Sequence, residues 1–70
     1  MRTRYQIGTA NHAGVKETHI VEVSTNSDGS RYVVGREFGC SRDYRVADDK
    51  TAVKMLLAEH AQKLNSIKKA

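Results

Sequence analysis

The sequence predicts an α+β fold: an antiparallel meander of three to four strands, followed by one C-terminal amphipathic helix packed on one sheet face, in the order β-β-β-(β)-α. Two observations support this prediction. Residues 48–67 place apolar side chains at a helical spacing, whereas the residues before them alternate between apolar and polar, as strands do. A chain of 70 residues has room for one hydrophobic core, so we expect a single domain over residues 1–70.

Four stretches of the chain before the helix are strand candidates. Residues 4–9 alternate regularly, and residues 16–23 end in a β-branched run that we expect at the centre of the sheet. Residues 31–38 are the third candidate. Residues 42–47 are either a short fourth strand or a loop that leads into the helix.

Turn and capping residues bound these elements. Asp28 and Gly29 lie in the most polar stretch of the chain and predict a hairpin loop between the second and third strands. Asp48 or Asp49 is placed to cap the helix, because an aspartate accepts hydrogen bonds from the free N–H groups of the first turn. The apolar stripe of the helix is expected to cover the sheet with Val53, Leu56, Leu57, His60, Leu64 and Ile67.

The aromatic residues of the last two strand candidates have two possible positions. Tyr32 and Phe38 share the phase that we assign to the core, and Tyr44 points the same way in the next stretch. Gly35 predicts a bulge, which would turn Arg36 away from the core. Whether the three aromatic residues are core or exposed is left open by the sequence.

Composition favours a small intracellular binding protein. One cysteine excludes an internal disulfide, so a homodimer or a larger partner is the expected support for so small a core. We expect a cytoplasmic location and no membrane contact, because the chain lacks a long apolar run and a signal-peptide pattern. The net charge of +4 and the pI near 9.5 favour acidic partners.

Motifs of enzymes and of metal or cofactor sites are not found in the sequence. Cys40 with one of the three histidines is the only nucleophile and base combination that we considered, and a plain turn cysteine is the simpler interpretation. His60 has Leu56 and Leu64 at the helical i−4 and i+4 positions, so we expect it to pack rather than to bind zinc. We therefore predict a protein that is not an enzyme, without metal or cofactor.

Basic residues are the main functional signal. Arginines alternate with tyrosine and phenylalanine in the last two strand candidates, a pattern typical of surfaces that hold single-stranded or structured nucleic acid through phosphate contacts and base stacking. A plain solvated face is the competing interpretation. The predicted nucleic-acid-binding residues are Arg31, Arg36, Arg42 and Arg45, with Lys16 and Lys50 at the periphery.

The alternative function is that of a phage-type or mobile-element-type inhibitor or adaptor that binds a host protein or protein complex. Such proteins are short, single-domain and non-catalytic, and they cover a surface of their partner. The outer face of the helix carries a patch without acidic residues that such a partner would contact. Its predicted contact residues are Lys54, Met55, Ala58 and Gln62.

The segment from Asp49 to Ala61 is loosely similar to the terminal helix of double-stranded-RNA-binding domains. The paired lysines that begin that helix in the family are absent, because Lys50 stands alone, and residues 1–15 contain no counterpart of the family's first helix. The resemblance covers little more than one helix, so the chain is not assigned to this family.

Overall fold

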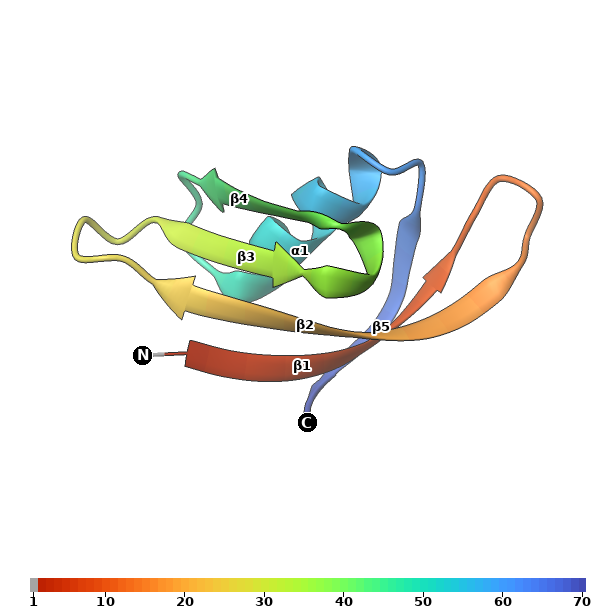
Figure 1. Cartoon of the computed structure of the whole chain (residues 1–70), viewed down its shortest axis with the longest axis horizontal. Coiled ribbons are helices and arrows are strands. Elements are labelled where there is room, and N and C mark those ends of the chain that lie inside the picture. Colours follow the sequence, from red (N-terminus) through yellow and green to blue (C-terminus); the bar gives the residue numbers. More distant parts are fainter. Residues whose placement is uncertain (1) are drawn as a thin grey trace.

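The computed structural model describes residues 2–70 as a five-stranded antiparallel sheet with one α-helix against one of its faces (Figure 1). The strands lie in the order β4-β3-β2-β1-β5. The predicted α+β class and antiparallel sheet are confirmed, and β2 occupies the centre as expected, although the sheet has one strand more than predicted. The elements are β1 (Arg2–Ala10), β2 (Lys16–Thr25), β3 (Arg31–Gly35), the 3-10 helix η1 (Arg36–Phe38), β4 (Cys40–Tyr44), α1 (Asp49–Ala58) and β5 (Lys63–Lys69).

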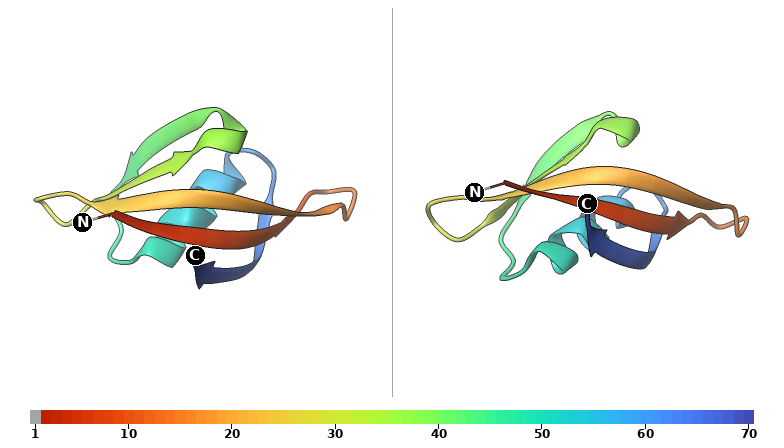
Figure 2. Two further views of the ribbon diagram at one scale, coloured as in Figure 1. Left: turned by 60° about the horizontal axis from the view of Figure 1, so that its bottom comes forward. Right: turned by 90° about the horizontal axis from the view of Figure 1, so that it is seen from below.

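The helix is shorter than its sequence pattern predicts. It was expected to continue to Ile67, but α1 ends at Ala58 and the chain turns back through Ala61, whose φ is 56°. The backbone N–H of Gln62 donates to the carbonyl of Leu57 at 2.9 Å and closes this turn. The residues that follow form β5, which pairs antiparallel with β1 (Figure 2).

A β-bulge explains why part of a strand has the spacing of a helix. Leu64 pairs with Thr9 and Ser66 pairs with Gly8, so Asn65 is an extra residue in the ladder. The bulge restores the phase, and Leu64 and Ile67 both face the core although they are three residues apart. An odd spacing in a strand normally puts two side chains on opposite faces, and this is why the pattern indicated a helix.

The core lies between α1 and the face of the sheet that it covers. Ile7 from β1, Val21 and Val23 from β2, and Val33 from β3 are fully or almost fully buried there. The helix contributes its inner face to the same cluster, namely Ala52, Val53, Leu56 and Leu57. Figure 2 shows the helix on one side of the long β1–β2 ribbon, so the other side of the sheet is left open.

The phase predicted for β3 is wrong. Val33 faces the core, whereas Tyr32 and Val34 lie on the open face of the sheet. Gly35 is buried beneath the helix, because a Cβ at this position would lie 2.9 Å from Cδ2 of Leu56. Gly35 is the last residue of β3, and η1 follows in place of the expected bulge.

β4 covers only part of the predicted fourth segment, and the other two aromatic residues lie in or beside the core. Residues 40–44 form β4, so the segment predicted over 42–47 is part strand and part loop. Tyr44 belongs to the core, as its phase predicted. Phe38 is half-buried in η1 and packs against the core from its margin.

The start of α1 is fixed by two neighbouring aspartates. Asp48 is the N-cap and accepts from the backbone N–H of Thr51 at 2.9 Å and from the Thr51 hydroxyl at 2.8 Å. These hydrogen bonds hold the pKa of Asp48 below its ordinary value of 3.8. Asp49 accepts from the Tyr5 hydroxyl at 2.5 Å, and this hydrogen bond raises the pKa of Tyr5 to about 12.

The cap gives a testable acid dependence. The carboxyl of Asp48 has a lower pKa in the folded chain than in the unfolded chain, so the unfolded chain binds the proton first and folding loses stability as pH falls. We expect the wild-type protein to lose stability between about pH 5 and pH 2 relative to Asp48→Asn, because asparagine caps a helix without titrating.

Urea unfolding of both proteins across this range measures the difference, and the other carboxyl groups cancel in the comparison. Asp48→Ala, which removes the cap at every pH, is the control. A constant difference between wild type and Asp48→Asn would show that the charge of Asp48 contributes nothing.

Candidate nucleic-acid interface

Two of the four arginines predicted to bind phosphate are engaged on the helix side of the sheet. Arg31 donates through Nε to Asp49 at 2.9 Å, and through its terminal nitrogens to the carbonyls of Gly29 and Ala47. Its side chain is only 17% exposed. Arg42 donates through Nε to Glu59 at 3.0 Å. Neither guanidinium faces the open side of the sheet.

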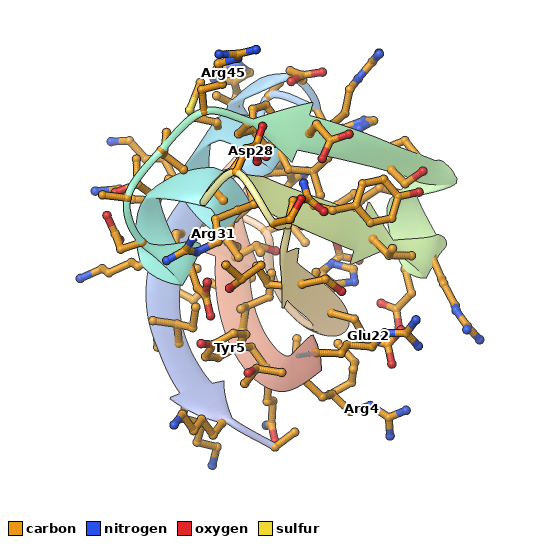
Figure 3. All side chains as sticks on the ribbon, turned by 90° about the vertical axis from the view of Figure 1, so that its left-hand side faces the viewer. Arg4, Tyr5, Glu22, Asp28, Arg31 and Arg45 are labelled. Carbon is orange, nitrogen blue, oxygen red and sulfur yellow. The ribbon has the colours of Figure 1, made fainter. Side chains whose placement is uncertain are left out.

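The other predicted residues are scattered over the molecule. Arg45 lies in the loop after β4 and lines a hollow with Asp28 of the β2–β3 hairpin (Figure 3). Lys16 lies at the far end of the β1–β2 ribbon, and Lys50 is exposed in the first turn of α1. Arg36 alone, in η1, borders the open face. The six residues therefore do not form one surface.

A different set of basic residues gathers where β1 and β5 meet on the open face. Lys68 is directly opposite Gln6 in the β1–β5 register, so both side chains leave the sheet on the same side as Arg2 and Arg4. The backbone N–H of Ala70 donates to the carbonyl of Arg4 at 2.9 Å and keeps the end of the chain against β1. We call Arg2, Arg4 and Lys68 the basic edge.

One carboxylate lies among these three cations. Glu22 of β2 is 3.4 Å from a terminal nitrogen of Arg4 and 4.0 Å from one of Arg2 (Figure 3). The side chains of both arginines remain more than 60% exposed. Lys68 forms no ion pair within the described residues 2–70. The basic edge thus keeps an excess of positive charge that solvent and ligands can reach.

Apolar side chains adjoin the basic edge on the same face. Ile20 of β2 is 40% exposed, and with Val34 of β3 it forms the apolar floor of a depression of about 190 Å³. Arg4, Glu22 and Arg36 are among the residues that border it. Tyr32 lies two residues before Val34 in β3, on the same face, and is half-buried. Its hydroxyl donates to Ser41 Oγ at 2.9 Å. We call Ile20, Val34 and Tyr32 the apolar strip.

Sequence reasoning found part of this surface and missed the rest. The alternation of residues 4–9 already puts Arg4 on the face opposite Tyr5 and Ile7. Lys68 is not among the predicted site residues, and only the β5 pairing brings it to the same face as Arg4. Tyr32 has the phase that we assign to the core, but the sequence left its position open, and the structure places it on the open face.

The predicted contact residues on the outer side of the helix divide into two groups. Lys54 and Met55 are exposed on α1, with Met55 42% exposed. Ala58 and Gln62 instead line a hollow between the end of α1 and the β1–β2 hairpin, together with His12 and Lys63. Ala58 follows Lys54 and Met55 at i+4 and i+3 on the exposed side of α1, so the hollow adjoins the helix surface, and a partner contact at these four residues stays a prediction.

Cys40 and His60 are brought together by the fold. Cys40 Sγ lies 3.0 Å from His60 Nε2, and the ring of Phe38 stacks on the imidazole with centroids 5.3 Å apart. Within residues 2–70, no group of three or more His, Cys, Asp or Glu side chains is arranged to hold a metal ion. No helix in the described part of the chain is long and apolar enough to span a membrane.

The position of Arg31 predicts a structural role. We expect Arg31→Gln to lower the free energy of unfolding by about 1–3 kcal/mol, because a partly buried charged hydrogen bond is lost and Asp49 keeps only Tyr5. Arg42→Gln is the matched control, since its pair with Glu59 is exposed and should contribute less than about 1 kcal/mol. Urea unfolding measures both losses, and equal losses would contradict this assignment.

The chain matches no model of a known protein family, and neither a curated protein nor a solved structure is similar to it. Its function is therefore argued from its own residues and their geometry.

Proposed function

We propose that the protein binds single-stranded nucleic acid on the open face of its sheet. The observation that carries this proposal is the basic edge, where Arg2 and Arg4 share the carboxylate of Glu22 and Lys68 has no ion pair within residues 2–70, beside the apolar strip with its exposed Ile20. Positive charge attracts the phosphate backbone, and neighbouring apolar and aromatic side chains provide a surface for the bases. The protein acts as a binding module and catalyses no reaction.

The basic edge binds the phosphates of the nucleic acid, and the apolar strip contacts its bases. Arg2, Arg4 and Lys68 bind phosphates along β1 and β5, and arginine suits this task because its fork contacts two oxygens. The apolar strip lies on the next two strands, about 10–15 Å across the sheet. That width accommodates a few nucleotides whose bases are unpaired, whereas a duplex hides the base faces from the strip.

Salt dependence and charge removal test the proposal. Fluorescence anisotropy with labelled single-stranded DNA and RNA should show binding at low salt, with a slope of log affinity on log salt of about −2 for three phosphate contacts. We expect Arg4→Gln and Lys68→Gln each to weaken binding about 3- to 10-fold. Lys54→Gln, which removes the same charge from the helix side, is the matched control and should leave affinity unchanged.

Absence of binding to either oligonucleotide at low salt would overturn the proposal. So would a Lys54→Gln variant that loses as much affinity as Arg4→Gln, because binding would then follow net charge and not this face.

Glu22 gives a prediction of opposite sign. Its carboxylate forms ion pairs with Arg2 and Arg4 and repels phosphate. Glu22→Gln should therefore tighten nucleic-acid binding about 3-fold or more at low salt. The same anisotropy titration measures this change, with Glu17→Gln as the control for net charge. Weaker binding of Glu22→Gln would mean that the ion pairs orient the arginines for the ligand.

The second candidate function is that of an inhibitor or adaptor that binds a partner protein. The depression floored by Ile20 and Val34 is bordered by charges of both signs, which fits an apolar side chain with polar neighbours. Ile20→Lys should then abolish capture of a stoichiometric protein from host lysate treated with nuclease. Capture that nuclease removes would favour nucleic acid.

A further inference from the structure

The Cys40 thiol lies in a cluster that the proposed function does not use. Its Sγ atom is 3.0 Å from Nε2 of His60, which lies in the turn after α1. Cys40 begins β4, an edge strand of the sheet, and is half-buried against the margin of the core. At this distance the thiol and the imidazole are within hydrogen-bond reach, which is the geometry of a nucleophile beside its base.

The orientation of the imidazole is set by its neighbours. The Phe38 ring stacks on His60 with an interplanar angle of 29°, and it also contacts the His19 ring, with centroids 4.7 Å apart. His19 in turn contacts the Glu37 carboxylate. The stacking on Phe38 restricts the rotation of the His60 ring, whose Nε2 lies against the sulfur.

Hydrogen bonds between β4 and Glu59 hold the two halves of the pair near each other. Glu59 precedes His60 and accepts hydrogen bonds from the Tyr44 hydroxyl and from Arg42 Nε, and the first of these holds the pKa of Glu59 below its ordinary value. Arg42 lies two residues beyond Cys40 in β4, on the same face, and its pair with Glu59 brings β4 and the residue before His60 together.

We propose that Cys40 is a site of reversible mixed-disulfide formation with small cellular disulfides, with His60 as the base. His60 Nε2 takes the thiol proton, and the Cys40 thiolate attacks one sulfur of a low-molecular-weight disulfide. The disulfide bond of the small molecule breaks as the new S–S bond forms. The leaving sulfur is reduced and takes the proton from His60, while the Cys40 sulfur is oxidised.

This chemistry is independent of nucleic-acid binding. Cys40 is in the phase of Arg42 and Tyr44, which faces the helix side, whereas the basic edge lies on the open face at β1 and β5, beyond β3 and β2. A group added at Cys40 displaces His60 from the sulfur and so acts first on the turn between α1 and β5. The failure of one proposal therefore leaves the other untouched.

The rate of reaction with dithiobis(nitrobenzoate), an aromatic disulfide that releases a coloured thiolate, tests the proposal. The chain has one cysteine, so the colour reports Cys40 alone, and Cys40→Ser is the blank. At about pH 6.5 an unassisted thiol is only about 1% ionised, and we expect the native protein to react at least about tenfold faster than His60→Gln. Near pH 9.5 the two rates should converge, because hydroxide then removes the proton without a base.

Two outcomes would overturn the proposal. One is a native protein that reacts no faster than His60→Gln at pH about 6.5. The other is a rate ratio that is the same at both pH values, because His60 would then only change access to the sulfur. Circular dichroism checks that the variant is folded.

If His60→Gln does not fold, the native protein and its urea-unfolded form are compared at the lower pH. The native protein must react faster, and a slower native rate overturns the proposal. Incubation with oxidised glutathione should add one glutathione to the native protein by mass spectrometry, reversibly with dithiothreitol. No adduct would exclude the biological disulfide class.

Discussion

The carboxylate of Asp49 joins parts of the chain that are far apart in sequence. It stands in the first turn of α1 and accepts hydrogen bonds from Tyr5 of β1 and Arg31 of β3, the strands on either side of central β2. The helix is thereby fixed across the middle of the sheet and not along one edge. Because Arg31 is used in this way, the one basic residue of β3 serves the architecture, and the cations of the basic edge lie on the opposite face at β1 and β5.

Local patterns predicted those elements that depend on local physics. The hairpin at Asp28 and Gly29 and the helix start at Asp48 follow from backbone preference and capping, which neighbouring residues decide. The helix end was misjudged because Leu64 and Ile67 have a helical spacing, and a bulge at Asn65 lets a strand present the same pair to the core. The bulge depends on pairing with β1, and the residues of β1 are too far from β5 in sequence for a local pattern to reveal it.

The candidate site was harder to predict for a related reason. Composition correctly indicates an excess of cations, but it does not say which of them are matched by carboxylates across the fold. Arg31 and Arg42 find Asp49 and Glu59 through tertiary contacts, whereas Arg4 and Lys68 become neighbours only through the β1–β5 register. Likewise, Cys40 and His60 are 20 residues apart, and the turn that ends α1 early is what carries the imidazole to the sulfur.

The β1–β5 pairing also sets the order in which the protein can be completed during synthesis. Tyr5 is opposite Lys69, so β1 gains its second neighbour only after β2, β3, β4 and α1 have been synthesised. Until then the hairpin of β1 and β2 presents a row of unpaired backbone groups beside Ile7, a state in which another nascent chain can add its own strand. Once β5 has paired with β1, β5 itself is the edge strand of the sheet. Its lysines then limit such association, because strands rich in lysine repel one another.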